Sequence, residues 1–188
     1  MGVHGTITQI RERRHGPGSC VVGLVRRWVL GRRAAGKTAS VSTQDEVESL
    51  YWRLIEGWNA RNPGSMASVI SGDGLVVGFD GSLMSGSDQV DRALGAIFAD
   101  HETATYVAKV RSVTALGPDA GLLHAVAGMV PPGGSAIMAD RNAIQTVVAR
   151  REDGGWAVVL FQTTPARFDG RPELAEALTR ELAALLPG

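Results

Sequence analysis

The spacing of apolar residues changes near Asp100, and this change constrains the fold more than any other feature of the sequence. Before it, apolar side chains recur every three or four residues, as on the buried face of a helix. After it, they alternate with polar ones, as in a half-buried strand. We expect helices over three early segments: 43–61, 65–70 and a third capped by Ser87.

Strands are expected on both sides of this change. Two short ones, 75–79 and 82–84, flank the hairpin dipeptide Asp80-Gly81. Gly- and Pro-rich turns separate four long ones, at 104–116, 120–130, 137–151 and 156–163, and a last helix begins at Pro172. This order predicts an α+β fold in which a strongly curved antiparallel sheet wraps around the N-terminal helices and leaves a conical pocket.

Charge divides the chain into two parts. Its 188 residues have no net charge, yet residues 1–42 carry eight arginines and lysines against one acid, Glu12. This segment is short of large apolar groups, and we expect a basic, disordered leader followed by one domain over 43–188. A basic arm that contacts acidic partners or nucleic acid is the alternative interpretation of the leader.

A phosphate-binding motif in the leader lacks its structural context. Gly31–Thr38 matches the P-loop pattern, but a polar stretch follows where a helix should begin, and antiparallel strands do not suit a P-loop fold. We therefore reject nucleotide binding.

One cysteine, Cys20, excludes a disulfide framework, and neither metal-ligand spacing nor a signal peptide is present. We expect a cytoplasmic protein without a metal or cofactor.

Several stretches of the folded part resemble one protein family. They are 50–59, 76–81, 95–101, 127–133, 142–146, 161–165 and the segment that begins at Gly170. Together they are similar to the SgcJ/EcaC family of the nuclear transport factor 2-like superfamily, whose fold is shared with ketosteroid isomerase and the SnoaL-like polyketide cyclases. The resemblance spans roughly 44–186 and is strongest to the SgcJ-like proteins encoded among the enediyne biosynthesis genes of actinomycetes.

This resemblance implies a role in antibiotic biosynthesis. The protein would be an accessory factor of an enediyne polyketide pathway that binds a polyene-like intermediate in its pocket and assists folding, cyclisation or isomerisation. A non-enzymatic module that binds the small molecule or docks on the synthase is the alternative, as is a protein-interaction domain using the outer sheet. The family's oxidoreductase label finds no support in these residues. Expected partners are an apolar conjugated ligand, a second copy in a homodimer and a polyketide synthase, but neither nucleic acid nor a membrane.

Three residues are candidates for acid–base chemistry. Isomerases and cyclases of the superfamily use an aspartate or histidine base with a donor that faces an enolate oxygen. Asp80 could serve as that base or bond its own hairpin turn. His101 ends a helix, where a cation is favoured by the dipole, and His124 could face either the cavity or the dimer side.

Neutral polar side chains within apolar strands are candidates for ligand binding. A buried amide needs partners, so Asn142, Gln145 and Gln162 either satisfy one another or orient a ligand carbonyl. Alternation places Asn142 and Gln145 on opposite faces of one strand, and Gln162 on the face of Trp156 and Val158. The remaining predicted ligand contacts suit a flat, conjugated molecule: Tyr51, Trp58, Asn59, Phe79, Met84, Phe98, Met129 and Phe161.

Overall fold

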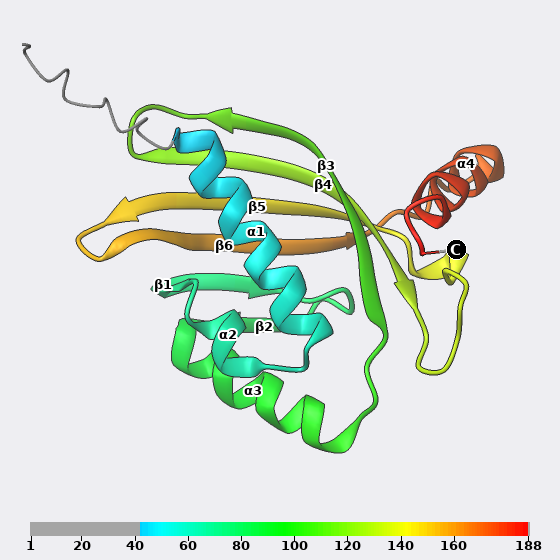
Figure 1. The fold of residues 1–188 in the computed structure, drawn as a ribbon, viewed down its shortest axis with the longest axis horizontal. Coiled ribbons are helices and arrows are strands. Elements are labelled where there is room, and N and C mark those ends of the chain that lie inside the picture. The colour runs from blue at the N-terminus through cyan, green and yellow to red at the C-terminus, as the bar shows by residue number, and fades with distance from the viewer. Residues whose placement is uncertain (1–41, 188) are drawn as a thin grey trace, which may run out of the picture. The chain divides into compact units, whose positions relative to one another are not determined.

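The computed structural model describes residues 42–187. The leader up to residue 41, with its P-loop-like sequence, lies outside the described residues. The elements run in the order α1 (Thr43–Asn59), α2 (Pro63–Ala67), β1 (Ile70–Val77), β2 (Leu83–Ser85), α3 (Ser87–Asp100), β3 (Thr105–Ala115), β4 (Ala120–Val130), the 3-10 turn η1 (Ala139–Arg141), β5 (Ala143–Glu152), β6 (Gly155–Pro165) and α4 (Pro172–Ala183) (Figure 1).

One sheet of six strands forms the body of the fold, in the order β2-β1-β6-β5-β4-β3. Its long strands pair antiparallel, and β3 bends around the end of α1 (Figure 1). The predicted α+β class with a curved sheet around N-terminal helices is confirmed. One pairing differs from the antiparallel pattern, because β1 lies parallel to β6. It joins the first hairpin to the last long strand, and no turn signal in the sequence specifies so distant a contact.

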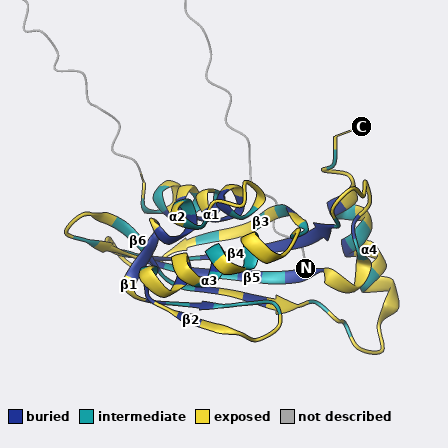
Figure 2. Ribbon diagram, turned by 90° about the horizontal axis from the view of Figure 1, so that it is seen from below, coloured by how far each residue is buried: buried dark blue, intermediate teal, exposed yellow. Residues whose placement is uncertain are grey.

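Helix α1 crosses one face of the sheet, which we call the inner face. Ser42 caps it, with the reciprocal backbone and side-chain bonds to Asp45 of a capping box. Its apolar side, which includes Val47, Leu50 and Leu54, is buried against the strands. Figure 2 shows the outward sides of the helices exposed and buried residues along the strands. Within residues 42–187 no helix is long and apolar enough to cross a membrane.

Glycine, rather than serine, caps α3. The sequence predicted Ser87 as the cap, but the cap residue is Gly86, with a φ of 77° and no side-chain bond. A Cβ at this position would lie 2.6 Å from the carbonyl oxygen of Gly72. Both the positive φ and the close backbone approach require glycine here. The helix therefore begins at Ser87, one residue earlier than it would with Ser87 as its cap.

A bulge in β6 changes which residues share a face. The register moves between Val148 opposite Leu160 and Ala149 opposite Val158, so Val159 is an extra residue in the strand. Beyond the bulge the alternation is reversed: Val158 and Phe161 both belong to the inner core. The prediction that Gln162 shares a face with Trp156 and Val158 was therefore wrong.

The segment before β5 also differs from expectation. The sequence predicted a strand from residue 137, with Asp140 and Arg141 in it, but these two residues lie in the helical turn η1. The amide of Met138 donates to the carbonyl of Met129 at 2.9 Å, and the amide of Arg141 donates to the carbonyl of Met138 at 3.0 Å. These bonds fold the segment back along β4 before β5 begins.

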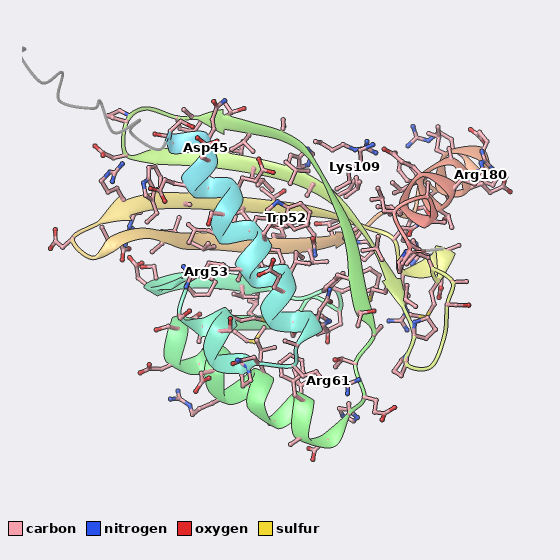
Figure 3. The ribbon with its side chains drawn as sticks, viewed as in Figure 1. Asp45, Trp52, Arg53, Arg61, Lys109 and Arg180 are labelled. Carbon is pink, nitrogen blue, oxygen red and sulfur yellow. The ribbon has the colours of Figure 1, made fainter. Side chains whose placement is uncertain are left out.

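Helix α4 covers part of the opposite, outer face. Leu178 and Leu182 pack there in a second apolar cluster with Val126 and other residues of that face. Glu181 accepts hydrogen bonds from Arg111 at 2.7 and 2.6 Å and from Lys109 at 2.7 Å. Lys109 lies between β3 and α4 in Figure 3. Hydrogen bonds from these two cations, Arg111 first, lower the pKa of Glu181 from 4.5 to about 2.

This arrangement makes the attachment of α4 dependent on pH. Because the pKa of Glu181 is lower in the folded state, its stabilising contribution is complete above pH 4.5 and is lost as pH falls toward about 2. We expect Glu181→Gln to lower the Tm at neutral pH, and the difference from wild type to shrink across that interval. Glu176→Gln is the control, since Glu176 pairs only with exposed Arg180 at 3.6 Å. An equal Tm loss in the control, or a difference independent of pH, would contradict this account.

Candidate functional site

A cavity of about 290 Å³ lies between the helices and the inner face of the sheet. Six of the predicted site residues line it: Trp58, Phe79, Asp80, Met84, Met129 and Phe161. They come from α1, the β1–β2 hairpin, β4 and β6, so the fold brings together side chains that are far apart in the sequence. Most of the lining is apolar, as is usual for a small-molecule site.

One wall of the cavity is aromatic. The ring of Trp58 lies 5.4 Å from that of Tyr106 and 5.4 Å from that of Phe98, measured between centroids. Its indole N–H donates to the carbonyl of Ala104 at 2.8 Å, which fixes the ring. Phe98 packs against Trp58 but does not itself line the cavity, so this predicted ligand contact supports the wall instead.

Asn59, another predicted contact, also has a structural role. Its amide nitrogen donates to the carbonyl of Tyr106 at 3.0 Å, and its amide oxygen accepts from the backbone N–H of Tyr106 at 2.7 Å. This pair of bonds joins the end of α1 to the start of β3 and positions the Tyr106 ring. Asn59 is absent from the lining of the cavity.

A buried polar chain runs beneath the cavity. The hydroxyl of Tyr51 donates to Oε1 of Gln145 at 2.7 Å, and Nε2 of Gln145 donates to the hydroxyl of Thr163 at 3.4 Å. Gln145 is fully buried, and Thr163 is 4% exposed. Of these three hydrogen-bonded residues, Thr163 lines the cavity, and Tyr51 and Gln145 lie behind it. Two predicted contacts thus belong to a network that supports the cavity floor.

The tyrosine hydroxyls of this region stay protonated at neutral pH. Burial raises the pKa of Tyr106 to about 12, and a hydrogen bond with Thr163 opposes part of that rise. Burial also raises the pKa of Tyr51 well above its ordinary range, and the nearby Tyr106 adds to the effect. Tyr106 and Thr163 both line the cavity, so they present neutral hydroxyls that can donate to a carbonyl oxygen.

Charged groups occur where the β1–β2 hairpin and η1 meet the cavity, a region we call the mouth. Oδ1 of Asp80 accepts from the hydroxyl of Ser82 at 2.7 Å and from its backbone N–H at 3.0 Å. These bonds lower the pKa of Asp80, the side-chain bond contributing most. A carboxylate stabilised in its charged form is a weaker base, and Asp80 lines the cavity with its pKa lowered in this way.

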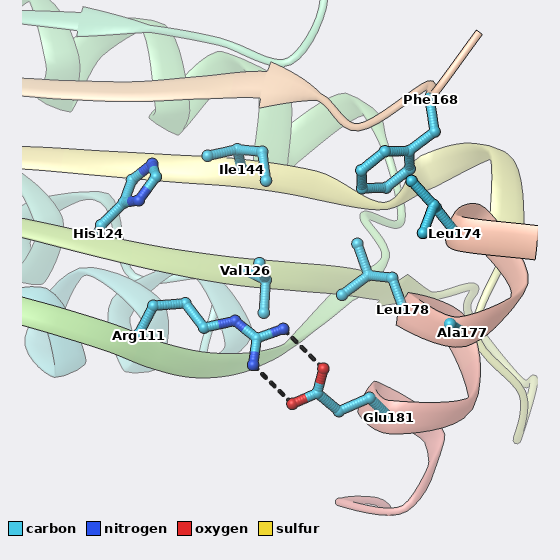
Figure 4. Close-up of a pocket in the computed structure, with 9 residues that line it drawn as sticks. All are labelled: Arg111, His124, Val126, Ile144, Phe168, Leu174, Ala177, Leu178 and Glu181. Atoms are coloured by element: carbon cyan, nitrogen blue, oxygen red, sulfur yellow. Dashed lines mark hydrogen bonds and ion pairs between the residues drawn. The ribbon is translucent and has the colours of Figure 1, made fainter. Parts of the chain in front are cut away.

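The two histidine candidates lie elsewhere. His101 is the exposed C-cap of α3 and does not line the cavity. His124 lies in β4 on the outer face, where it lines a groove beneath α4 together with Arg111 and Leu178 (Figure 4). Neither histidine is therefore placed at the conical pocket by the structure. For His124 the sequence left both faces open, because alternation alone does not say which face is inner.

Two of the predicted amides are also outside the cavity. Asn142 is 2% exposed and donates to the hydroxyl of Thr179 at 2.7 Å, so it faces α4. Gln162 is exposed and donates to Thr164 at 3.1 Å on the outer face. The expectation that Asn142 and Gln145 face opposite sides is confirmed, and Gln145 is the inner residue.

The groove beneath α4, about 390 Å³, is larger than the cavity but a weaker candidate. It is more open to solvent, and its charged residues Arg111 and Glu181 satisfy each other through two hydrogen bonds (Figure 4). The inner cavity instead combines enclosure, apolar walls and neutral hydroxyl groups on its lining. Those properties are the ones that orient a small ligand.

Several lining residues were missed as ligand contacts by the sequence analysis. Tyr106 and Ile97 carry no motif, and their position depends on where β3 and α3 begin and end. Arg141 was expected to be solvated at the start of a strand near the cavity mouth, whereas it lies in the η1 turn and lines the cavity. In the described range 42–187, no three His, Cys, Asp or Glu side chains form a metal-binding group.

Comparison with known proteins gives the fold. No protein-family model matches the chain, and no curated protein matches it. Several solved structures are similar to the chain in fold. A cystatin-like domain of unknown function from Nostoc punctiforme has 18% identity and a TM-score of 0.64 over 73% of this chain and 86% of its own. An NTF2-like protein from Novosphingobium aromaticivorans has 18% identity and a TM-score of 0.55 over 71% and 86%.

A ketosteroid isomerase-like protein from Erwinia carotovora has 12% identity and a TM-score of 0.52, over 65% of this chain and 95% of its own. At these identities the likeness concerns the fold alone. The chain has the cystatin-like, NTF2-like α+β fold, which confirms the predicted fold class. Membership of the SgcJ/EcaC family stays a prediction.

The polar network can be tested with two glutamines on adjacent strands. Gln145→Ala removes a fully buried amide and leaves the Tyr51 hydroxyl without its acceptor, so we expect a loss of about 2–3 kcal/mol in the free energy of unfolding. Gln162→Ala, the control on the exposed side, should change it by less than about 0.5 kcal/mol. Urea denaturation measures both. Similar values for the two variants would contradict the assignment of faces.

Proposed function

We propose that the protein binds a small, flat, largely apolar molecule in the inner cavity. The observation that carries this proposal is the enclosed apolar cavity of about 290 Å³ with neutral hydroxyl donors at Tyr106 and Thr163. Burying an apolar ligand there removes its surface from water, and a single hydrogen bond to a carbonyl would fix its orientation.

The class of ligand follows from the resemblance to the SgcJ/EcaC family. We propose an accessory role in enediyne or polyketide biosynthesis, with a polyene-like intermediate as the ligand. A rigid wall formed by Trp58 and Tyr106 suits a planar conjugated chain, since aromatic faces favour stacked or edge contacts. Holding such a chain in one shape would favour one folding or cyclisation outcome without covalent participation of the protein.

Acid–base catalysis has little support from the lining residues. Asp80 is the lining carboxylate, and its pKa is lowered by Ser82 rather than raised toward neutrality. A proton-abstracting isomerase needs a base whose pKa lies nearer the working pH. Steering of a reactive ligand is therefore favoured over isomerase chemistry, and a purely binding or synthase-docking module is the second candidate.

Titration with a neutral probe tests the cavity directly. All-trans methyl octatrienoate is flat, conjugated and apolar, and has one carbonyl. We expect the full chain to bind it with a micromolar dissociation constant in isothermal titration calorimetry. Ile97→Phe, which adds volume to the cavity wall, should weaken binding by about tenfold or more.

A matched substitution identifies which hollow is used. Ile144→Phe adds the same volume in the groove beneath α4 and should leave the affinity for the ester unchanged. If Ile144→Phe abolishes binding while Ile97→Phe does not, the groove is the site. If wild-type protein does not bind the ester, the proposed function fails.

We also propose that a second copy pairs with the outer face. Leu122, Val148 and Leu160 lie side by side across β4, β5 and β6, and all three are half-buried. Helix α4 covers the neighbouring part of this face, around Val126. A row of partly exposed apolar side chains on a sheet is a suitable surface for association.

Sedimentation equilibrium of the full chain checks this pairing. We expect a dimer, and Leu160→Glu should convert it to a monomer because a carboxylate would be placed among apolar neighbours. Leu116→Glu is the control, since Leu116 is 56% exposed between β3 and β4 and away from the row. A monomer in wild-type protein, or dissociation by the control alone, would contradict the proposed interface.

A further inference from the structure

Arg141 is the cation of the cavity lining. It belongs to η1, its side chain is 51% exposed, and its guanidinium carbon lies 5.7 Å from the centroid of the Phe79 ring. Contact with the face of Phe79 is a cation–π arrangement. A guanidinium held this way keeps its N–H groups at the edge available to an acceptor.

The charge of Arg141 is weakly compensated. Its ion pair within residues 42–187 is with Asp140, at 3.8 Å, and that carboxylate is 82% exposed. Three other arginines of the sheet, at 111, 150 and 151, reach carboxylate oxygens at 3.1 Å or less. Arg141 therefore differs from them in having hydrogen-bonding capacity that its protein neighbours do not fill.

The backbone around Arg141 is fixed. Asn142, the next residue, accepts from the amide of Ala166 at 2.8 Å through its carbonyl and donates to Thr179 on α4 through its side chain. On the other side, Met138 is bonded to Met129 of β4. These contacts hold η1 between the sheet and α4, so the backbone that carries the guanidinium has a defined position at the mouth.

The carboxylate of the cavity lining does not neutralise Arg141. Asp80 lies beyond the 4.0 Å limit of an ion pair with it, and Oδ1 of Asp80 is already bonded twice to Ser82. A ligand anion would be repelled by Asp80 and attracted by Arg141. The two charges together define on which side of the mouth an anionic group can lie.

We propose that Arg141 binds the carboxylate of an amphipathic acid whose apolar body occupies the cavity. This inference rests on the proposed function and adds the chemical class of its ligand. The conjugated body packs against Trp58 and Met129, and the carboxylate lies at the mouth, where guanidinium and carboxylate can form two parallel hydrogen bonds. A free acid is then preferred to its neutral ester.

Comparison of acid and ester provides the test. All-trans octatrienoic acid and its methyl ester share one conjugated body and differ in the charge of the end group. At neutral pH we expect the full chain to bind the acid about tenfold more tightly than the ester in calorimetric titrations. Arg141→Gln should remove this preference, so that the variant binds the acid and the ester with similar affinity.

Two variants separate a specific contact from net charge. Arg180→Gln removes the same charge from an exposed arginine that lies outside the cavity lining and pairs with Glu176 at 3.6 Å, so the preference for the acid should persist. Arg141→Lys retains the charge without the planar fork and should keep only part of the preference.

The outcomes distinguish the two proposals. Equal binding of acid and ester by wild-type protein, or a preference that survives Arg141→Gln, overturns the role of Arg141 and leaves the proposed function intact. Loss of the preference in Arg180→Gln as well would show a general charge effect and would also overturn it. Binding of neither compound overturns the proposed function and this inference together.

Discussion

The hydrogen bond between Tyr51 and Gln145 connects the helical layer to the sheet at the centre of the core. It is 2.7 Å long, and it joins α1 to β5 across 94 positions of sequence. Both residues are buried, so an unpaired hydroxyl or amide here would lose its water partners without replacement. That cost favours the packing of α1 in which the two groups meet. Placed in this way, α1 covers the inner face, and the cavity lies beside its C-terminal end.

The cavity depends on the curvature of the sheet around that helix. Bulges in β3, near Arg111, and in β6, at Val159, disrupt the regular ladder and increase the local bend of these strands. The curved strands enclose a space that the apolar side chains do not fill, and Tyr106 and Thr163 supply the polar groups on its lining. On the opposite face, α4 braces Asn142 and thereby the turn that carries Arg141.

Much of the fold could be predicted from the sequence, because helix and strand periods are local properties. The start of α1 at Thr43 and the course of β4 from Ala120 to Val130 follow directly from nearby residues. The incorrect predictions arise where tertiary structure interrupts the alternation of apolar and polar residues along a strand. A single extra residue in β6 moved Gln162 to the outer face, and the folding back of residues 138–141 replaced part of an expected strand.

The site was predictable in part for the same reason. Side chains such as Trp58, Met84 and Phe161 were correctly placed at the cavity, since large apolar residues on the buried sides of elements tend to surround any hollow. Polar candidates were harder to assign, because an amide in a strand can serve a network on either face. Gln145 supports the cavity floor and Asn142 supports α4, a difference that depends on which face of the sheet is inner.

Methyl NMR of the methionines tests the central claim, that the inner cavity is the binding site. Met66, Met84 and Met129 line the cavity, whereas Met138 lies outside its lining. In the full chain with labelled methionine methyl groups, titration with methyl octatrienoate should shift the first three resonances together, with one dissociation constant, and move Met138 little. A shift of Met138 alone, or saturation of the protein without a response from the three cavity methionines, would contradict the account.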